Sequence, residues 1–174
     1  VTLTMTLTGQ CRNAGPVRRS GGRAGDALWV NGEIGWGGLG LQAARDGGPE
    51  QVAQRYRVPR ISSLFAAQTV ADLATASMDV SDGLLIDASR LAAVSGCGLE
   101  IDLGAVPLAN PTQNTADILS QCTAGDDYRI LLSAAVGRPV SGFAAIGKLT
   151  AERGLRLFHD GQAVNAPSIL GFEH

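Results

Sequence analysis

The sequence predicts a single α+β domain in which helices pack against a mixed β-sheet. Short alternating or apolar runs, typical of strands, are interspersed with segments whose apolar residues recur at helical spacing. The two kinds of element follow one another without a regular β-α-β repeat, which favours the α+β class. The chain has 174 residues, of which 45% are hydrophobic and 17% charged, so it is long enough to bury a core.

Two strands are predicted near the N-terminus of the chain. The run VTLTMTLTG alternates from its first residue and predicts a strand over residues 1–9. A lone strand is marginally stable, so its partners lie later in the chain or on a segment that is absent. A loop rich in glycine and arginine follows, and ALWVNG then predicts a short buried strand closed by the turn signal Asn31-Gly32.

Three helices are predicted next. GWGGLGLQAARDGG is helical up to its terminal glycine pair, and Pro49 suits the first turn of a second helix that closes before Pro59. A third helix covers about residues 62–75. Its expected buried stripe consists of Leu64, Phe65, Val70 and Leu73.

The second half of the chain predicts more strands than helices. SMDV is a short strand, residues 83–95 form a helix with Gly96 as its C-cap, and LEIDL alternates as a strand. A short helix is expected within VPLANPTQNTADILSQ, followed by strands at DYRILLSAA and GFAAIGKLT. GLRLFHDGQAV predicts a hairpin that turns at Asp160-Gly161.

Composition argues against several classes of function. The formal net charge is −2, from 14 basic and 16 acidic residues, and no basic stripe indicates nucleic acid or an anionic membrane. No run of apolar residues is long enough to span a bilayer. Cys11, Cys97 and Cys122 form no CxxC pair, and their odd number argues against a disulfide framework. A reducing cytoplasm is therefore the expected compartment. Each cysteine is expected to be a small buried hydrophobic residue.

The most informative segment is SMDVSDGLLIDASRL. Asp79 and Ser81 are two residues apart, so on a strand they point to the same side, and Asp82 falls at the first turn of the next helix. Capping by Ser81 or Asp82 is the simplest interpretation. It leaves Asp79 unexplained, because a carboxylate at a strand end that looks buried needs a cation or hydrogen-bond donors. Helix N-termini attract phosphate and carboxylates hold Mg²⁺, so the alternative is a site for Mg²⁺ and a nucleotide.

Two further clusters are ambiguous by themselves. Asp126 and Asp127 in TAGDDYRILL precede a strand and fit a solvated turn. Arg18, Arg19 and Arg23 lie among glycines, where they form either an exposed basic loop or a set of phosphate contacts.

Taken together, five segments resemble the thiamine-monophosphate kinase family: VRRSGGRAGDALWVNG, SMDVSDGLLIDASRLAAVSGCGLEIDLGAVPL, AGDDYRILL, IGKLT and GFEH. The similarity covers nearly the whole chain and matches the later half or so of that enzyme. The SDGL segment followed by a GDDY-type turn is fairly specific. SDGL alone also occurs in the wider superfamily of aminoimidazole ribonucleotide synthetase-like proteins, whose C-terminal domain is the fold that the resemblance implies.

The resemblance implies ATP- and Mg²⁺-dependent phosphorylation of thiamine monophosphate to thiamine diphosphate. Carried over by position, Asp79 and Asp82 match Mg²⁺ ligands, while Ser81 and Arg19 match contacts to ATP. Direct in-line transfer needs positioning and charge neutralisation, so no side chain is expected to act as a nucleophile.

The acceptor side and the domain organisation follow from the same resemblance. Asp126 matches an acidic residue that faces the thiamine substrate, and Phe172 matches an aromatic residue that packs on its rings. Residues 1–20 correspond to the last strand and linker of an N-terminal ATP-binding domain, and residues 21–174 to the C-terminal domain. In the family, the N-terminal half carries further aspartates and a Gly-Gly-Asp turn that hold most of the Mg²⁺ and the ATP phosphates, so this chain alone is expected to be inactive. Family members also dimerise through that half.

Two alternatives stay open at this point. One is another ATP-dependent member of the superfamily, related to selenophosphate synthetase or to purine biosynthesis. The other is a non-catalytic domain that binds a small molecule.

Overall fold

The computed structural model describes residues 2–11 and 15–173 and confirms the α+β class. A seven-stranded mixed sheet has the strand order β2-β4-β1-β5-β3-β6-β7. The strands are β1 (Ala27–Asn31), β2 (Ala76–Val80), β3 (Gly98–Asp102), β4 (Arg129–Ala134), β5 (Phe143–Thr150), β6 (Leu155–His159) and β7 (Gln162–Val164). The helices are α1 (Trp36–Asp46), α2 (Glu50–Arg57), α3 (Leu64–Leu73), α4 (Leu84–Val94) and α5 (Thr115–Cys122), with a 3₁₀ turn, η1 (Leu103–Ala105).

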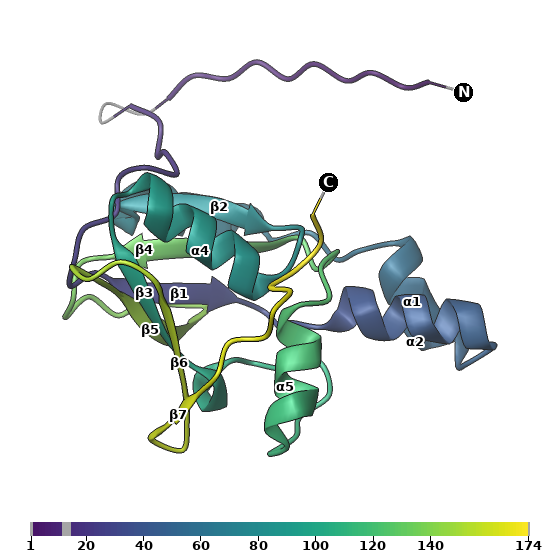
Figure 1. Ribbon diagram of the computed structural model, residues 1–174. Helices are drawn as coiled ribbons and strands as arrows, with labels where there is room; N and C mark the ends of the chain where they lie inside the picture. Colours follow the sequence, from purple (N-terminus) through teal and green to yellow (C-terminus); the bar gives the residue numbers. More distant parts are fainter. Residues whose placement is uncertain (1, 12–14, 174) are drawn as a thin grey trace.

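The sheet is antiparallel except where β3 and β6 run parallel. Strand β1 lies near its centre, between β4 and β5 (Figure 1). The β6–β7 hairpin turns at Asp160 and Gly161, whose φ angles are 50° and 73°, so the predicted turn is confirmed.

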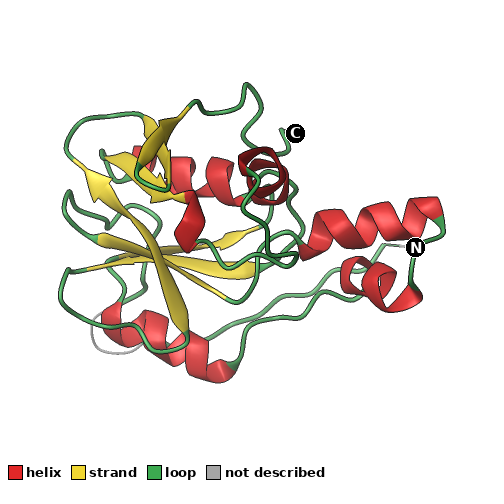
Figure 2. Ribbon diagram, turned by 90° about the horizontal axis from the view of Figure 1, so that it is seen from below, coloured by secondary structure: helices red, strands yellow, loops and turns green. Residues whose placement is uncertain are grey.

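Helices cover both faces of the sheet, and side chains alternate between the two faces along each strand. In β4, Leu131 packs into the main core with Leu85 and Leu91 of α4, whereas Leu132 packs into a smaller cluster with Val70 of α3. Figure 2 shows the sheet between its helices and the α1–α2 hairpin projecting beyond them. No helix in residues 2–11 and 15–173 has the length and apolar character needed to cross a membrane.

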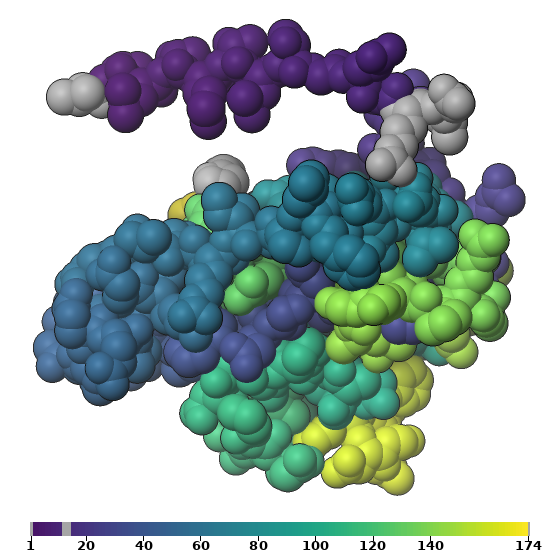
Figure 3. Space-filling model, turned by 180° about the vertical axis from the view of Figure 1, so that it is seen from behind, coloured from purple at the N-terminus to yellow at the C-terminus, as the bar shows by residue number. Residues whose placement is uncertain are grey.

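The predicted N-terminal strand is wrong for the residues that are described. Residues 2–11 form no strand, and Leu3, Met5 and Leu7 are more than 80% exposed. The segment extends away from the body of the protein (Figures 1 and 3), and none of the described strands pairs with it. An alternating pattern therefore does not suffice, because a strand also needs a neighbour. Val1 lies outside the described residues.

The buried stripe of α3 differs from the predicted one. Val70 and Leu73 pack against the sheet as expected, but Leu64 is 77% and Phe65 is 58% exposed. The buried positions are Ala66 and Thr69. Positions 66, 69, 70 and 73 lie on one helical face, which places residue 64 opposite that face and residue 65 beside it. Of the cysteines, Cys97 and Cys122 are buried as expected, whereas Cys11 is exposed.

Candidate functional site

The loop between β2 and α4 is organised by a buried carboxylate that follows it in sequence. The Asp87 carboxylate accepts hydrogen bonds from the backbone N–H groups of Ser81 and Asp82, both at 2.9 Å. The predicted capping by Ser81 or Asp82 is wrong, because the cap residue is Gly83 and it makes no side-chain cap bond. From inside the first turn of α4, Asp87 instead accepts from the N–H groups of two loop residues that precede the cap residue, so it holds the loop and does not cap the helix.

Arg90 joins this loop to the helix. Its guanidinium donates to the carboxylate of Asp82 and, at 3.0 Å, to that of Asp87. The hydrogen bond to Asp82 is the largest cause that raises the pKa of Arg90. The side chain of Asp87 is 1% exposed and that of Asp82 15%, so the two carboxylates are held in fixed positions around one cation.

Asp79 faces solvent, contrary to the prediction of a buried-looking carboxylate. Its side chain is 54% exposed, whereas Met78 and Val80 on either side of it are buried. The Arg19 guanidinium lies 3.9 Å from its carboxylate, so the basic loop reaches the end of β2 as an ion pair. Solvent and this arginine supply what a carboxylate at the strand end requires.

The GDDY turn packs against the same loop. The backbone N–H groups of Asp126 and Tyr128 donate to the carbonyl oxygens of Ser81 and Val80, each at 2.8 Å. Asp126 and Tyr128 have φ angles of 57° and 50°, in the left-handed region that non-glycine residues rarely adopt. The Tyr128 hydroxyl also donates to the Asp126 carboxylate at 3.0 Å, which fixes the carboxylate. Strain of this kind is frequent at binding sites.

Asp127 is a residue that sequence reasoning missed. It was expected in a solvated turn, but it is 4% exposed and accepts hydrogen bonds from the N–H groups of Gly35 at 2.8 Å and Gly37 at 3.1 Å. Burial raises the pKa of Asp127, and these N–H groups act in the opposite direction. The carboxylate thereby fastens the start of α1 to the GDDY turn. The residues that it joins, Gly35 and Asp127, are 92 positions apart, so no pattern of neighbouring residues could predict the contact.

One cavity collects most of the predicted residues. It measures about 310 Å³ and lies where the loop, the GDDY turn and the C-terminal tail meet, with the Phe172 N–H donating to the Asp82 carbonyl at 2.8 Å. Its lining consists of Leu41, Tyr56, Ser81, Asp82, Ala124, Gly125, Asp126 and Phe172. Four of the six predicted site residues are therefore together, while Asp79 and Arg19 pair with each other outside this lining. Leu41 and Tyr56, from the α1–α2 hairpin, carried no signal in the sequence.

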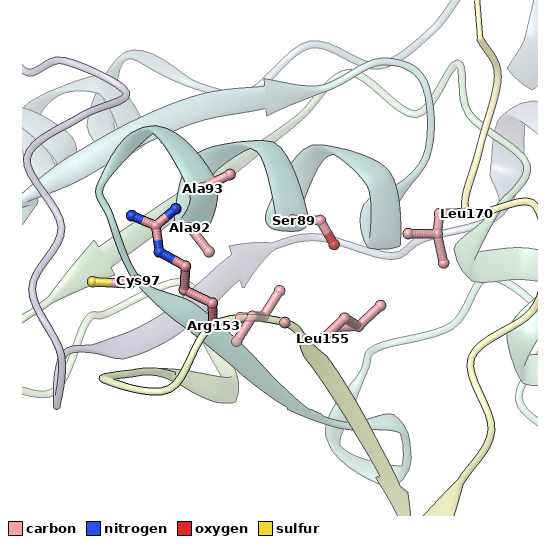
Figure 4. A pocket seen from close by; sticks show the side chains of 9 residues that line it. Ser89, Ala92, Ala93, Cys97, Arg153, Leu155 and Leu170 are labelled. Carbon is pink, nitrogen blue, oxygen red and sulfur yellow. The ribbon is translucent and has the colours of Figure 1, made fainter.

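A second cavity, of about 300 Å³, lies between α4 and β6 (Figure 4). Small and apolar side chains line it, and among the described residues of its lining only Arg153 is charged. None of those described residues is a carboxylate, so the cavity beside Asp82 and Asp126 is the better candidate for phosphate and metal chemistry.

Gly37 offers a test of how α1 supports the site. A Cβ at this position would lie 2.3 Å from the carbonyl oxygen of Gly125 and 2.8 Å from the side chain of Asp126. Gly37→Ala should therefore displace the turn and lower the free energy of unfolding by about 1–3 kcal/mol in a urea titration. Gly104→Ala, where the added Cβ meets its nearest atom at 3.4 Å, is the control. Equal stability of the two variants would contradict the close approach.

The fold agrees with known proteins. The model of the AIR synthase related protein C-terminal domain matches residues 23–160, which include Asp79, Ser81, Asp82 and Asp126. The chain belongs to this family. A shared domain does not by itself specify an activity.

The more specific relatives are thiamine-monophosphate kinases. The enzyme of Caulobacter vibrioides is 33% identical in an alignment 201 positions long, which covers 99% of this chain and 54% of that protein. The solved structure of AaThiL complexed with AMPPCP and TMP is 29% identical with a TM-score of 0.73, covering 89% of this chain and 53% of the other. Escherichia coli HypE, a hydrogenase maturation protein, has a TM-score of 0.65 at 21% identity, covering 87% and 53%, and shares the fold. The chain thus spans about half the length of the relatives that it matches.

Proposed function

We propose that this chain forms the part of a thiamine-monophosphate kinase that binds thiamine monophosphate, the acceptor of the phosphoryl group. In the proposed reaction, the terminal phosphate oxygen of thiamine monophosphate attacks the γ-phosphorus of ATP. A new P–O bond forms, the bond to the β-phosphate oxygen breaks, and ADP leaves. The observation that carries this proposal is the convergence of Ser81, Asp82, Asp126 and Phe172 on one cavity.

The residues divide by chemistry within that cavity. Asp126 and Phe172 would contact the thiamine part of the acceptor, and Ser81 would contact ATP together with Arg19. The loop that carries Ser81 is tied to α4, because the Asp87 carboxylate accepts hydrogen bonds from two of its N–H groups. The protein would act by positioning the two phosphates in line, without a phosphorylated side chain.

Asp79 and Asp82 are the proposed Mg²⁺ ligands, and their chemistry fits this role. They are carboxylates on one short segment, and the ion would have to compete with the arginines that pair with them, Arg19 and Arg90. Mg²⁺ is commonly held by one or two carboxylates with phosphate oxygens and water, so two carboxylates suffice when ATP is present. The bound ion would neutralise charge that develops on the transferring phosphate. The described residues include no cluster of three acidic, histidine or cysteine groups, so ATP would have to complete the coordination.

The wider organisation is also a proposal. Residues 1–20 would be the last strand and linker of an N-terminal ATP-binding domain, and residues 21–174 the C-terminal domain. The apolar side chains of Leu3, Met5 and Leu7, all more than 80% exposed, suit a strand that pairs with such a domain. Full-length members would dimerise through that domain in the cytoplasm, and this chain alone would transfer little or no phosphate.

Isothermal titration of the purified chain, alongside a turnover assay, tests the proposal. Thiamine monophosphate is titrated with and without Mg²⁺ and AMPPCP. Saturable binding without turnover is the expected result, since both proposed thiamine contacts, Asp126 and Phe172, lie in this chain. Absence of binding under every condition would contradict the proposed function, and turnover would contradict the inactivity of the chain alone.

The Asp126→Asn variant examines the acceptor side directly. Removing the charge should lower the affinity for thiamine monophosphate by about tenfold, because a hydrogen bond to a charged group contributes about 1.5–3 kcal/mol. Asp117→Asn, in the first turn of α5 and outside the cavity, is the matched control. Unchanged titration curves for Asp126→Asn would remove this residue from the acceptor site.

A further inference from the structure

Tyr56 enters the candidate cavity from an element that the sequence did not connect with the site. This half-buried residue of α2 lines the cavity together with Asp126 and Phe172. The cavity thus has two aromatic side chains from different parts of the fold, the α1–α2 hairpin and the C-terminal tail.

Packing holds Tyr56 in place. Helices α1 and α2 approach so closely at Gly40 that a Cβ there would lie 2.7 Å from the Tyr56 backbone nitrogen. The hairpin is fixed at its base by the buried carboxylate of Asp127, which binds the N–H groups of Gly35 and Gly37. The position of the Tyr56 backbone is therefore set by the fold and does not depend on a free loop.

The two carboxylates that line this cavity differ in how their charge is neutralised. The carboxylate of Asp82 is paired with Arg90, whereas Asp126 makes no ion pair within the part of the chain that the structure describes. The partner of Asp126 is the neutral hydroxyl of Tyr128, whose pKa is raised by this hydrogen bond first and by burial next. Tyr128 therefore remains a donor at neutral pH, and the negative charge of Asp126 is left uncompensated.

An uncompensated carboxylate beside aromatic side chains suits a cationic ligand. Cations are attracted to the faces of aromatic rings, and the attraction grows as water is excluded. We infer that Tyr56 is a specificity-determining residue which, with Phe172 and Asp126, selects acceptors whose ring carries a positive charge. This inference rests on the proposed function, and it adds that the charge of the ring, more than its shape, decides acceptance.

The experiment compares two ligands of the same shape on the purified chain. One is thiamine monophosphate, with its cationic thiazolium ring, and the other is the analogue in which the ring nitrogen is replaced by carbon, which makes the ring neutral. Titration calorimetry should show about tenfold weaker binding of the neutral analogue. Tyr56→Leu should lower the affinity for the cationic ligand by about tenfold and leave that for the neutral one nearly unchanged. Tyr56→Phe should retain the discrimination.

The control is Phe65→Leu, which removes an exposed aromatic ring from α3 outside the cavity. Circular dichroism of each variant establishes that the helices are retained. If the chain binds thiamine monophosphate but Tyr56→Leu keeps full discrimination, this inference is overturned and the proposed function stands. If the unsubstituted chain binds neither ligand, the proposed function and the inference both fail.

Discussion

Leu131→Ala is expected to lower the free energy of unfolding by about 3 kcal/mol. Leu131 has no exposed surface and lies in β4, between Val30 of β1 and Met78 of β2. Neighbouring strands and α4 enclose the side chain, so the vacated volume can collapse only in part. Truncation of a fully buried leucine costs about 2–5 kcal/mol, because transfer energy is lost and a cavity is left.

Urea denaturation followed by circular dichroism measures this loss. Val136→Ala is the control, since its side chain is 73% exposed a few residues later in the chain. Its change should stay within about 0.5 kcal/mol. A loss below about 1 kcal/mol for Leu131→Ala would mean that β4 is not central to the core.

Asp87→Ala is expected to destabilise the protein by a similar amount, about 3 kcal/mol, for an electrostatic reason. The change leaves the N–H groups of Ser81 and Asp82 without their acceptor and takes one of two carboxylates from Arg90. Each buried polar group that loses its partner costs about 1–3 kcal/mol. Arg90 is itself partly exposed, so water limits its share of the loss.

The effect of Asp87→Ala should also be local. Amide hydrogen exchange at Ser81 and Asp82 should accelerate more than exchange at Leu131, because the loop loses its fixed conformation first. Asp87→Asn should fall between the unsubstituted protein and Asp87→Ala in stability. Its amide oxygen can still accept both N–H groups, as one carboxylate oxygen of Asp87 does, but its NH₂ group cannot accept from Arg90. Asp46→Ala, at the exposed end of α1, is the control. Equal stability of Asp87→Ala and Asp46→Ala would show that the loop is held by other contacts.

These results bear on the site because its parts come from distant segments. The loop after β2, the GDDY turn and the C-terminal tail meet through backbone hydrogen bonds made by Asp126, Tyr128 and Phe172. Loss of any one segment would open the cavity. Stability and ligand binding should therefore decline together in variants of Asp87, whereas variants of Asp126 and Tyr56 should affect binding more than folding.

The sequence predicted the local elements well because periodicity and turn residues act over short distances. The hairpin at Asp160-Gly161, the end of α1 at Gly47 and the short β2 strand were all found from residue patterns. The residues of the candidate site were also nominated from the sequence, although mainly through resemblance. Of these, Ser81, Asp82, Asp126 and Phe172 line the same cavity.

The tertiary structure decided what those residues contact. It placed Gly83 at the cap position in place of Ser81 or Asp82, turned Asp79 toward solvent and Arg19, buried Asp127, and brought Tyr56 to the cavity. It also left residues 2–11 without a strand partner. Apart from the N-terminal segment, the sequence by itself determined which elements form, because helical and strand periodicity depends on neighbouring residues. Only the tertiary structure determined their partners, because contacts such as that between Gly35 and Asp127 join residues 92 positions apart.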